Sequence, residues 1–363
     1  MTLGIYIHVP FCGKKCGYCN FYSVGYSGKS AQLYTDAVIR NLEYYSDKST
    51  LTDTVYFGGG TPSLLKTEQI ESILSGIKNN FLLSQNAEIT LEANPRTLNP
   101  QKLEILRSIG INRISFGVQS MIDDELEILG RSHNAQQAVK VVYDAYNAGF
   151  ENISCDLMTA VPKQTAESLE YSIEKLSELP IKHISSYILK IEENTPFYTG
   201  NIKSLLPDEE QTAEFYLRTV ELLENHGFYQ YEISNFAKQG FESRHNTRYW
   251  KCMDYIGIGS SAHSCYKGKR FAVPDDINKF IGNKIQPVEI TDENPCGFEE
   301  YSMLRLRLKE GLDLREFPEK KKFLEKKIPP LVNSGYAVYD GNTISLTPKG
   351  FLMSNSIISY LIF

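Results

Sequence analysis

The sequence predicts an α/β protein made of repeated strand–helix units, followed by a small carboxy-terminal domain of helices and a hairpin. Apolar segments with the alternation of strands recur up to about residue 226, and each is followed by a segment with helical periodicity. Parallel strands joined by right-handed crossovers form either a barrel or a doubly wound sheet. Polar and glycine-rich residues gather just after the strands, which favours a barrel with one functional rim.

Each of the six units follows from its own pattern. In the first strand Ile5, Ile7 and Val9 alternate with more polar neighbours. Asn99 before Pro100 is a favourable helix start, because asparagine caps free N–H groups and proline is preorganised for the first helical position. The expected strands and helices are, in order, 5–9 and 32–45, 54–57 and 67–81, 88–92 and 100–108, 113–116 and 134–147, 153–157 and 166–179, and 183–189 and 208–226.

From about Thr291 the pattern changes to short helices and one hairpin. Asp340-Gly341 between two alternating runs is a strong hairpin signal. The expected elements are a helix at 298–308, a loop at 312–317, a charged helix at 320–331 interrupted at Pro329 and Pro330, strands at 336–339 and 343–346, and a helix at 348–361. These elements predict a winged-helix-like α+β domain, and the chain divides into residues 1–235, 236–290 and 291–363.

Composition excludes several classes of protein. The chain has 363 residues and a formal net charge of −6, which argues against a protein held mainly by nucleic-acid phosphates. Seven cysteines, three of them in one loop, do not fit a secreted disulfide framework, so we expect a cytoplasmic protein in a reducing environment. The first ten residues read as a strand and not as a signal segment, and no apolar run reaches the length of a membrane span.

Cys12, Cys16 and Cys19 form a C-x3-C-x2-C motif. A closed structural metal site needs four ligands, whereas three thiolates can hold three irons of a [4Fe-4S] cluster and leave the fourth iron open. Two other interpretations are a zinc site completed by a remote residue and a set of buried thiols. The remote candidates are the histidines and Cys155, Cys252, Cys265 and Cys296. Three cysteines this dense, beside two glycines and two lysines, favour the cluster.

Further polar or flexible residues stand where strands end. Gly58, Gly59 and Gly60 follow the second strand, and glycines let a ligand approach the backbone. Asp156 interrupts an apolar strand, where an unpaired carboxylate would be costly to bury. Glu92, Gln119 and Arg131 also lie at or after strand ends. Together they predict a ligand site on the same rim as the cysteines.

The cysteine motif resembles that of the radical S-adenosylmethionine (SAM) family. Other stretches resemble its HemN/HemW branch, which contains oxygen-independent coproporphyrinogen III dehydrogenases and heme chaperones. These stretches are residues 5–12, 57–63, 91–95, 114–120, 129–131, 231–235 and 344–350. The resemblance covers nearly the whole chain and implies an open (βα)6 partial TIM-type barrel. It also implies that the open iron binds SAM, from which an electron releases a 5′-deoxyadenosyl radical.

The resemblance also assigns SAM contacts. In this sequence they fall on Tyr6, Gly59, Gly60, Thr61, Glu92, Gln119, Arg131, Asp156 and Lys190. The residue types suit the ligand, because carboxylates accept ribose hydroxyls and arginine pairs with the methionyl carboxylate. Residues 158–163 depart from the usual family pattern, which bears on the loop beyond Asp156.

Two features favour the heme-chaperone side of the branch. Phe21 stands where the dehydrogenases have a fourth cysteine, and the dehydrogenases' amino-terminal extension has no counterpart before the first strand. Residues 245–250 resemble the HNxxYW signature that is linked to heme. His245 offers an imidazole for an axial position of heme iron, and Tyr249 and Trp250 offer flat apolar surface. The alternative is that His245 is a hydrogen-bonded structural histidine.

Gly257 to Ala262 imitates a dinucleotide-binding fingerprint but lacks the strand–helix context, so we interpret it as a backbone turn.

The expected function is a heme chaperone with a [4Fe-4S] cluster, SAM and heme as cofactors. The alternatives are a radical SAM enzyme acting on a tetrapyrrole, either a coproporphyrinogen decarboxylase or a heme-opening methyltransferase, and an RNA-modifying radical SAM enzyme. No catalytic residue is assigned. The expected partners are heme, a heme-acceptor protein and an electron donor such as a flavodoxin or ferredoxin, without nucleic acid. An acceptor in a membrane would place the protein peripherally at that membrane.

Overall fold

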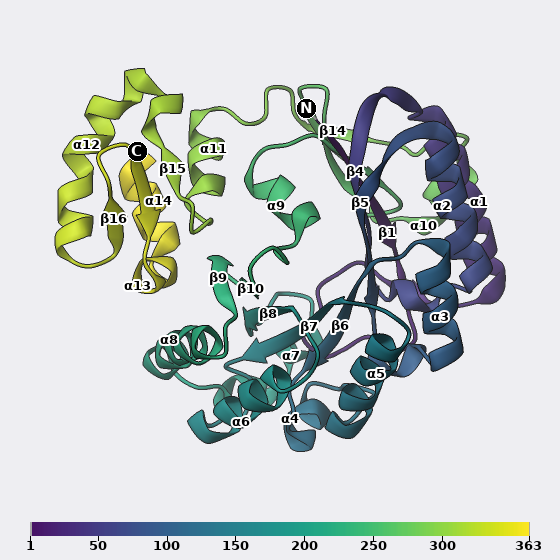
Figure 1. Ribbon diagram of the computed structural model, residues 1–363, viewed down its shortest axis with the longest axis horizontal. Helices are drawn as coiled ribbons and strands as arrows, with labels where there is room; N and C mark the ends of the chain where they lie inside the picture. The colour runs from purple at the N-terminus through teal and green to yellow at the C-terminus, as the bar shows by residue number, and fades with distance from the viewer. Residues whose placement is uncertain (1, 363) are drawn as a thin grey trace.

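The computed structural model describes residues 2–362, and its centre is a mixed sheet with helices around it (Figure 1). Across these residues the large sheet has twelve strands in the order β14-β13-β12-β11-β1-β4-β5-β6-β7-β8-β10-β9. The six strands from β1 to β8 in this order are parallel neighbours. They are β1 Leu3–Val9, β4 Asp47–Gly59, β5 Phe81–Ala93, β6 Arg113–Gln119, β7 Asn152–Thr159 and β8 His183–Ile188. The fold is therefore the predicted α/β partial barrel.

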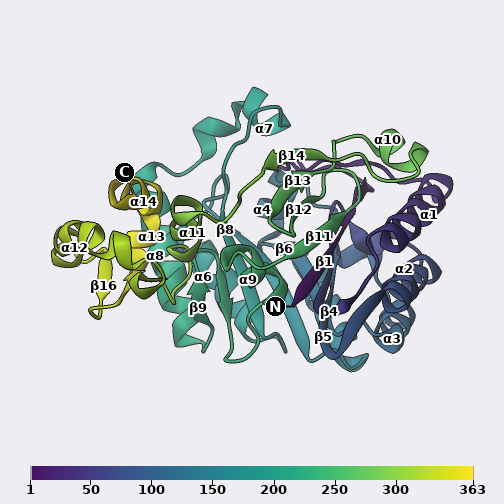
Figure 2. The same cartoon turned by 90° about the horizontal axis from the view of Figure 1, so that it is seen from above.

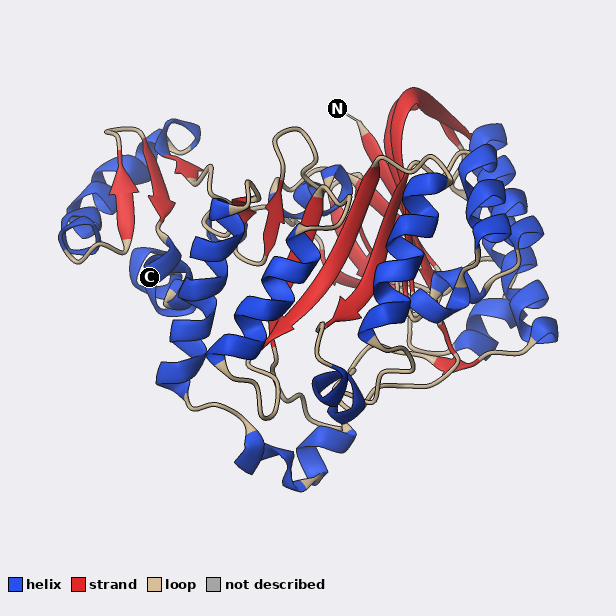
Figure 3. Ribbon diagram, turned by 60° about the horizontal axis from the view of Figure 1, so that its bottom comes forward, coloured by secondary structure: helices blue, strands red, loops and turns tan. Residues whose placement is uncertain are grey.

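Six helices follow these strands and lie on the outer face of the curved sheet, as Figures 1 and 3 show. They are α1 Gly28–Tyr44, α2 Thr67–Asn80, α3 Pro100–Ile109, α5 Ala135–Asn147, α6 Ala166–Ser177 and α8 Glu209–Asn225. The expected cap of α3 is present, because the side chain of Asn99 accepts a hydrogen bond from the backbone N–H of Lys102 at 2.8 Å. The apolar stripes of the helices pack on the sheet and form one continuous core. No helix among residues 2–362 is both long enough and apolar enough to cross a membrane.

Short elements extend the sheet at both ends. On one side β11 Tyr255–Ile258 pairs parallel to β1, and β12 His263–Tyr266, β13 Lys269–Ala272 and β14 Glu289–Asp292 continue antiparallel. On the other side β10 Asn235–Ala237 and β9 Tyr229–Glu232 pair antiparallel after β8. Strands of three or four residues carry too little alternation to be recognised in the sequence. The expected connecting segment 236–290 thus contributes strands to the sheet, and the division at 235 and 290 stays a prediction.

The remaining elements of this part are short connections. They are β2 Phe11–Cys12, β3 Val24–Gly25, α4 Asp123–Ile128, α7 Pro196–Thr199, α9 Arg244–Trp250 and α10 Ile277–Gly282.

The carboxy-terminal elements lie at one end of the molecule beside α8 (Figures 1 and 2). They are α11 Phe298–Arg305, β15 Leu312–Asp313, α12 Pro318–Asn333, β16 Ala337–Tyr339, β17 Thr343–Leu346, α13 Pro348–Leu352 and α14 Ser354–Ile362. The predicted hairpin is confirmed as β16 and β17.

Three details of the carboxy-terminal prediction were wrong. Helix α12 is not interrupted at Pro329 and Pro330, because Ile328 and Leu331 on either side are buried on the same core and keep the helix in place. Residues 312–313, expected in a loop, pair with β17 as an edge strand. The last helix is two helices that meet at Met353.

Gly257 shows how tightly β11 and β12 pack against each other. A Cβ atom at this position would lie 2.1 Å from the backbone oxygen of His263, so only glycine fits. The chain then turns back after Gly259, where the N–H of Ala262 donates to the Gly259 carbonyl at 3.1 Å. Gly257 and Ile258, which were expected in the turn, belong to β11, and the backbone turn begins at Gly259 and leads into β12.

We therefore predict that Gly257→Ala lowers the free energy of unfolding by about 1–3 kcal/mol, because the added methyl group forces β11 and β12 apart. The measurement is the denaturation midpoint in urea. Gly28→Ala is the matched control, since a Cβ at Gly28 meets nothing within 4 Å. An unchanged midpoint for Gly257→Ala would show that the two strands separate without cost.

Candidate functional site

A cavity of about 380 Å³ opens at the carboxyl ends of the parallel strands, within the size range of small-molecule sites. Its walls bring together residues that are far apart in the sequence. The lining residues are Cys12, Lys14, Lys15, Cys16, Tyr18, Cys19, Phe21, Gly59, Gly60, Thr61, Pro62, Glu92, Ala93, Asn94, Ser115, Gly117, Gln119, Arg131, Asp156, Met158 and Tyr187. All three motif cysteines and seven of the nine predicted SAM contacts are in this set.

The cysteine loop begins where β1 ends. The N–H of Cys19 donates to the carbonyl of Cys16 at 3.2 Å, which closes a tight turn inside the motif. The guanidinium of Arg131 donates to the Cys16 sulfur at 3.4 Å and supplies positive charge to the loop. Burial raises the pKa of the Cys19 thiol, and the neighbouring Cys12 and Cys16 sulfurs raise it further. A cationic group bound by the three sulfurs would counter this effect at Cys19, because positive charge favours the thiolate.

The three thiols fit an iron–sulfur cluster better than a single ion. Within residues 2–362, no three His, Cys, Asp or Glu side chains are arranged to hold one metal ion. In a cubane each thiolate binds a different iron, so the sulfurs need not converge on one point. All three cysteines are free and partly exposed. The zinc alternative, which requires a fourth converging ligand, therefore has no support in the described residues.

The glycine turn after β4 lies directly against the start of the cysteine loop. The N–H of Gly60 donates to the Val9 carbonyl at 2.8 Å, and that of Thr61 donates to the Phe11 carbonyl at 2.7 Å. A Cβ at Gly60 would lie 2.6 Å from the Phe11 oxygen. Glycine is thus required for the close approach of the two backbones, and this approach places the turn on the cavity wall.

Two carboxylates stand on the cavity floor. Glu92 accepts a hydrogen bond from the Tyr56 hydroxyl at 2.7 Å and one from the Gly59 N–H at 3.2 Å. Burial raises the pKa of Glu92 to about 7, although the hydrogen bonds from Tyr56 and Gly59 act to lower this pKa. Burial also raises the pKa of Asp156, which accepts a hydrogen bond from Ser115 at 3.3 Å. Both carboxylates gain from a ligand that brings further hydrogen-bond donors.

Arg131 and Gln119 complete the wall. The Nε atom of Arg131 is buried and has no hydrogen-bond partner among the described residues, so one strong donor stays free for an anion. Gln119 is the last residue of β6 and has a φ of 78°, an unusual conformation for a residue with a side chain. This conformation ends the strand and leaves the Gln119 side chain on the cavity wall.

Two predicted SAM contacts lie outside the cavity. Tyr6 lies beneath it: a Cβ at Gly58 would contact its ring at 3.0 Å, and its hydroxyl bonds to the His8 ring at 3.1 Å. Lys190 is exposed and forms an ion pair with Glu192 at 2.8 Å. A contact between either residue and a ligand stays a prediction.

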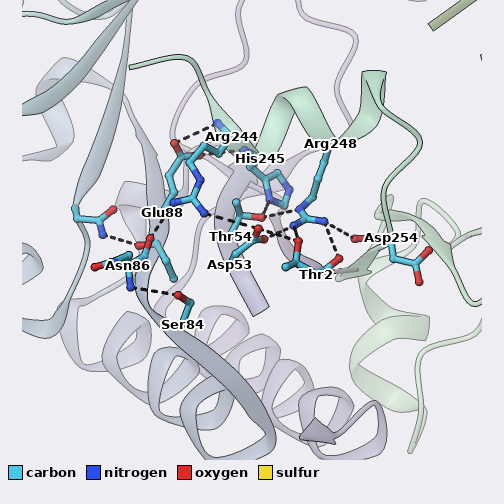
Figure 4. A network of polar contacts seen from close by, with 12 residues as sticks. Thr2, Asp53, Thr54, Ser84, Asn86, Glu88, Arg244, His245, Arg248 and Asp254 are labelled. Carbon is cyan, nitrogen blue, oxygen red and sulfur yellow. Dashed lines mark hydrogen bonds and ion pairs between the residues drawn. The ribbon is translucent and has the colours of Figure 1, made fainter. Parts of the chain in front are cut away.

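His245, predicted as a heme ligand, is fully buried in α9 (Figure 4). Its Nδ1 bonds to the Thr54 hydroxyl and its Nε2 to the Tyr249 hydroxyl, both at 2.9 Å. Its backbone N–H donates to Glu88 at 3.1 Å. Burial lowers the pKa of His245 to about 3, so the ring is neutral. Both ring nitrogens are occupied here, and heme ligation, which stays a prediction, would require the ring to give up one of these bonds.

Sequence reasoning missed Ser115, Met158 and Tyr187, which also line the cavity. Strand alternation could have found Met158, because residues two apart on a strand share one face and Met158 follows Asp156 by two. Tyr187 depends on the pairing of Met158 with Tyr187 on the neighbouring strand. This register is a property of the folded sheet and was not available from the sequence.

Comparison with known proteins agrees with this geometry. Residues 6–176 match the model of the radical SAM superfamily. The chain is 35% identical to the heme chaperone HemW of Lactococcus lactis, across 97% of this chain and 95% of that protein. It is 36% identical to HemW of Bacillus subtilis, with 97% of each chain covered, and 32% identical to HemW of Escherichia coli, with 98% of this chain and 97% of that one covered.

A solved structure supports the fold. Coproporphyrinogen III oxidase (HemN) from Escherichia coli, described as a radical SAM enzyme, superposes with a TM-score of 0.84. The match covers 99% of this chain and 90% of that one, at 22% sequence identity. The predicted resemblance to the HemN/HemW branch is confirmed. Because its relatives match over nearly the whole length, the chain belongs to the heme chaperone HemW family of the radical SAM superfamily.

Proposed function

We propose that the protein is a heme chaperone: it binds heme and hands it to an acceptor protein, with a [4Fe-4S] cluster on Cys12, Cys16 and Cys19 and SAM in the adjoining cavity. One observation carries the part of the proposal that concerns the cluster and SAM. A single cavity holds the three thiols, a glycine turn, two buried carboxylates and a guanidinium with a free donor. This combination of groups matches the chemical needs of SAM beside an open iron.

Each group would bind a different part of SAM. Arg131 would pair with the methionyl carboxylate, Gly59 and Gly60 would let the methionyl backbone approach closely, and Glu92 and Asp156 would accept ribose hydroxyls. When bound, the cluster would supply one-electron chemistry to SAM. An electron donor of the flavodoxin or ferredoxin type is the proposed partner for that step.

We propose that heme binds at the mouth of the cavity. Phe21 lines the cavity and 66% of its surface is exposed, as is 43% of Tyr187, so a flat apolar ligand would find two aromatic side chains there. Lys14 and Lys15 line the same opening and could pair with propionates. We also propose that His245 is the axial ligand of the heme iron.

Heme handling is favoured over porphyrinogen decarboxylation by Phe21. The dehydrogenases of this branch resemble the chain but carry a cysteine at that position, whereas here an apolar ring occupies the cavity mouth. We place the protein in the cytoplasm, because its seven cysteines are all free, as expected in a reducing compartment. An acceptor in a membrane would bring it to that surface.

The first prediction concerns the cluster. Anaerobically reconstituted protein should contain about four irons per chain, because three thiolates hold a four-iron cubane. Cys12→Ala, Cys16→Ala and Cys19→Ala should each lose it, as measured by iron content and absorption spectrum. Cys252→Ala, which changes a half-buried cysteine away from the cavity, is the control. Full clusters in all three motif variants would disprove the assignment.

The second prediction concerns SAM. Asp156→Asn should weaken SAM binding to the reconstituted protein by about 1.5–3 kcal/mol, about 10–100-fold, because it removes a charge-assisted hydrogen bond. Calorimetric titration measures the affinity, and iron content checks that the cluster is intact. Asp144→Asn is the control, since that carboxylate pairs with Lys140 on the surface. Equal affinities in both variants would remove Asp156 from the site.

The third prediction concerns heme. Titration should give a saturable change of the Soret band at about one equivalent of heme, without conversion of coproporphyrinogen by the reduced protein with SAM. If the imidazole is axial, Tyr249→Phe should strengthen heme binding, because it frees Nε2 of His245, and His245→Ala should shift the Soret band. Circular dichroism checks that the variants fold. Formation of protoporphyrinogen would favour the enzyme alternative.

A further inference from the structure

Glu92, on the cavity floor, is bonded to a tyrosine that does not itself line the cavity. Tyr56 is only 7% exposed and is not among the lining residues. The Tyr56 hydroxyl donates to Oε1 of Glu92 at 2.7 Å, and the Gly59 N–H donates to Oε2 at 3.2 Å. Each oxygen of an ionised carboxylate can accept two hydrogen bonds, so each keeps an acceptor position for a ligand.

The ring of Tyr56 is held by two other rings. Its centroid lies 5.2 Å from that of His245, with an angle of 26° between the ring planes, and 6.1 Å from that of Tyr6. His245 is itself fixed, because its two ring nitrogens are bonded to Thr54 and Tyr249. A ring packed in this way has little freedom to turn, so the Tyr56 hydroxyl is directed at Glu92 before a ligand arrives.

Gly58 leaves the room that this contact needs. A Cβ atom at Gly58 would lie 3.0 Å from the rings of both Tyr56 and Tyr6 and 3.2 Å from the Glu92 carboxylate. Any side chain at this position would have to displace the groups that hold the carboxylate. Within the glycine turn, Gly60 therefore allows the approach to the cysteine loop, whereas Gly58 allows the contact between Tyr56 and Glu92.

The same hydrogen bond acts on the charge of Glu92. Burial raises the pKa of Glu92 to about 7, and the bond from Tyr56 acts against this rise. Of the charged groups around it, Asp156 raises this pKa further and Arg113 lowers it. The tyrosines around Glu92 are neutral at this pH, because burial and then the charge of Glu92 raise the pKa of Tyr6, Tyr187 and Tyr249. Without the Tyr56 hydroxyl, Glu92 would take up its proton at a higher pH.

We propose that Tyr56 is a positioning residue for SAM: its hydroxyl directs the Glu92 carboxylate and keeps it ionised for the ribose hydroxyls of the ligand. This role rests on the proposed function, in which Glu92 accepts those hydroxyls. Tyr56 does not line the cavity, so its effect reaches SAM only through Glu92. A protonated carboxyl group has fewer acceptor positions than a carboxylate, so SAM binding should strengthen as the pH rises through the Glu92 titration.

The test is the SAM affinity as a function of pH, measured by calorimetric titration of the full-length, anaerobically reconstituted protein. Tyr56→Phe keeps the packed ring and removes only the hydroxyl. At neutral pH its affinity for SAM should be about tenfold lower, because a hydrogen bond to a charged group is lost. The midpoint of its pH profile should lie at higher pH than that of the wild type, and the difference in affinity should narrow above this midpoint.

Further variants make the result specific. A ring-fluorinated tyrosine at position 56 is a stronger donor of nearly the same size, so it should move the midpoint to lower pH. Tyr216→Phe is the matched control, since this buried hydroxyl donates to the Ile233 carbonyl at 3.1 Å, outside the cavity, and its loss should leave affinity and midpoint unchanged. In a Glu92→Gln background, which has no titrating group at that position, Tyr56→Phe should cause no further loss of affinity.

The outcomes separate this role from the proposed function. Circular dichroism and iron content confirm that each variant is folded and carries the cluster. If the wild type binds SAM and Tyr56→Phe shows the same affinity and midpoint, the positioning role is overturned while SAM binding stands. An equal loss from Tyr56→Phe with and without Glu92 would also overturn it, because the tyrosine would then act by another route. Absence of SAM binding by the reconstituted wild type would overturn the proposed function and the role of Tyr56 together.

Discussion

The parallel pairing of six consecutive strands is the constraint on which the rest of this structure depends. Parallel strands all end at the same edge of a sheet, and each must be connected by a helix on the outside. Strand β1 delivers the cysteine loop to that edge, β4 delivers the glycine turn, and β5 to β7 deliver Glu92, Gln119 and Asp156. Helices α1, α2, α3, α5, α6 and α8 cover the outer face and exclude water from the core. The site therefore exists only once the sheet has assembled.

Charged side chains are buried inside the partial barrel, where desolvation costs free energy but where the charges lie close to the cavity. Arg113 is fully buried, and its Nε and Nη1 atoms have no hydrogen-bond partner among the described residues. Glu88, Tyr56 and Asp156 are among the groups whose charges act on it. A buried charge network of this kind adds little to stability, but it keeps carboxylates and cations ready at defined positions. Glu92 is a second example: burial raises its pKa, and the same buried position places its carboxylate where a ligand can donate a hydrogen bond to it.

The segment around α9 connects the sheet to the carboxy-terminal elements. Figure 4 shows Arg248, which is buried and donates to the carbonyls of Thr2 and Asp254 and to Asp53 and Thr54. These bonds fix the start of β1 and the approach to β11 from one side chain. A bridge between Glu232 and Leu308 attaches the end of β9 to the carboxy-terminal part. Arg248, one residue of the HNxxYW segment, thus links the start of β1, β4 and the approach to β11.

The sequence by itself determined the local structure and the chemistry of this protein. Alternation and helical periodicity predicted six strand–helix units, and the spacing of Cys12, Cys16 and Cys19 predicted the kind of metal group. Polarity and glycines at strand ends also predicted a site that includes Gly59, Gly60, Glu92, Gln119, Arg131 and Asp156, all of which line the cavity, whereas Thr61 was assigned only by the family resemblance. Only the tertiary structure decided which of them face one another. The short strands β11 to β14, the cavity position of Tyr187 and the closed environment of His245 all depend on register and packing between distant segments. Those interactions are non-local, so no pattern within a single stretch of sequence contains them.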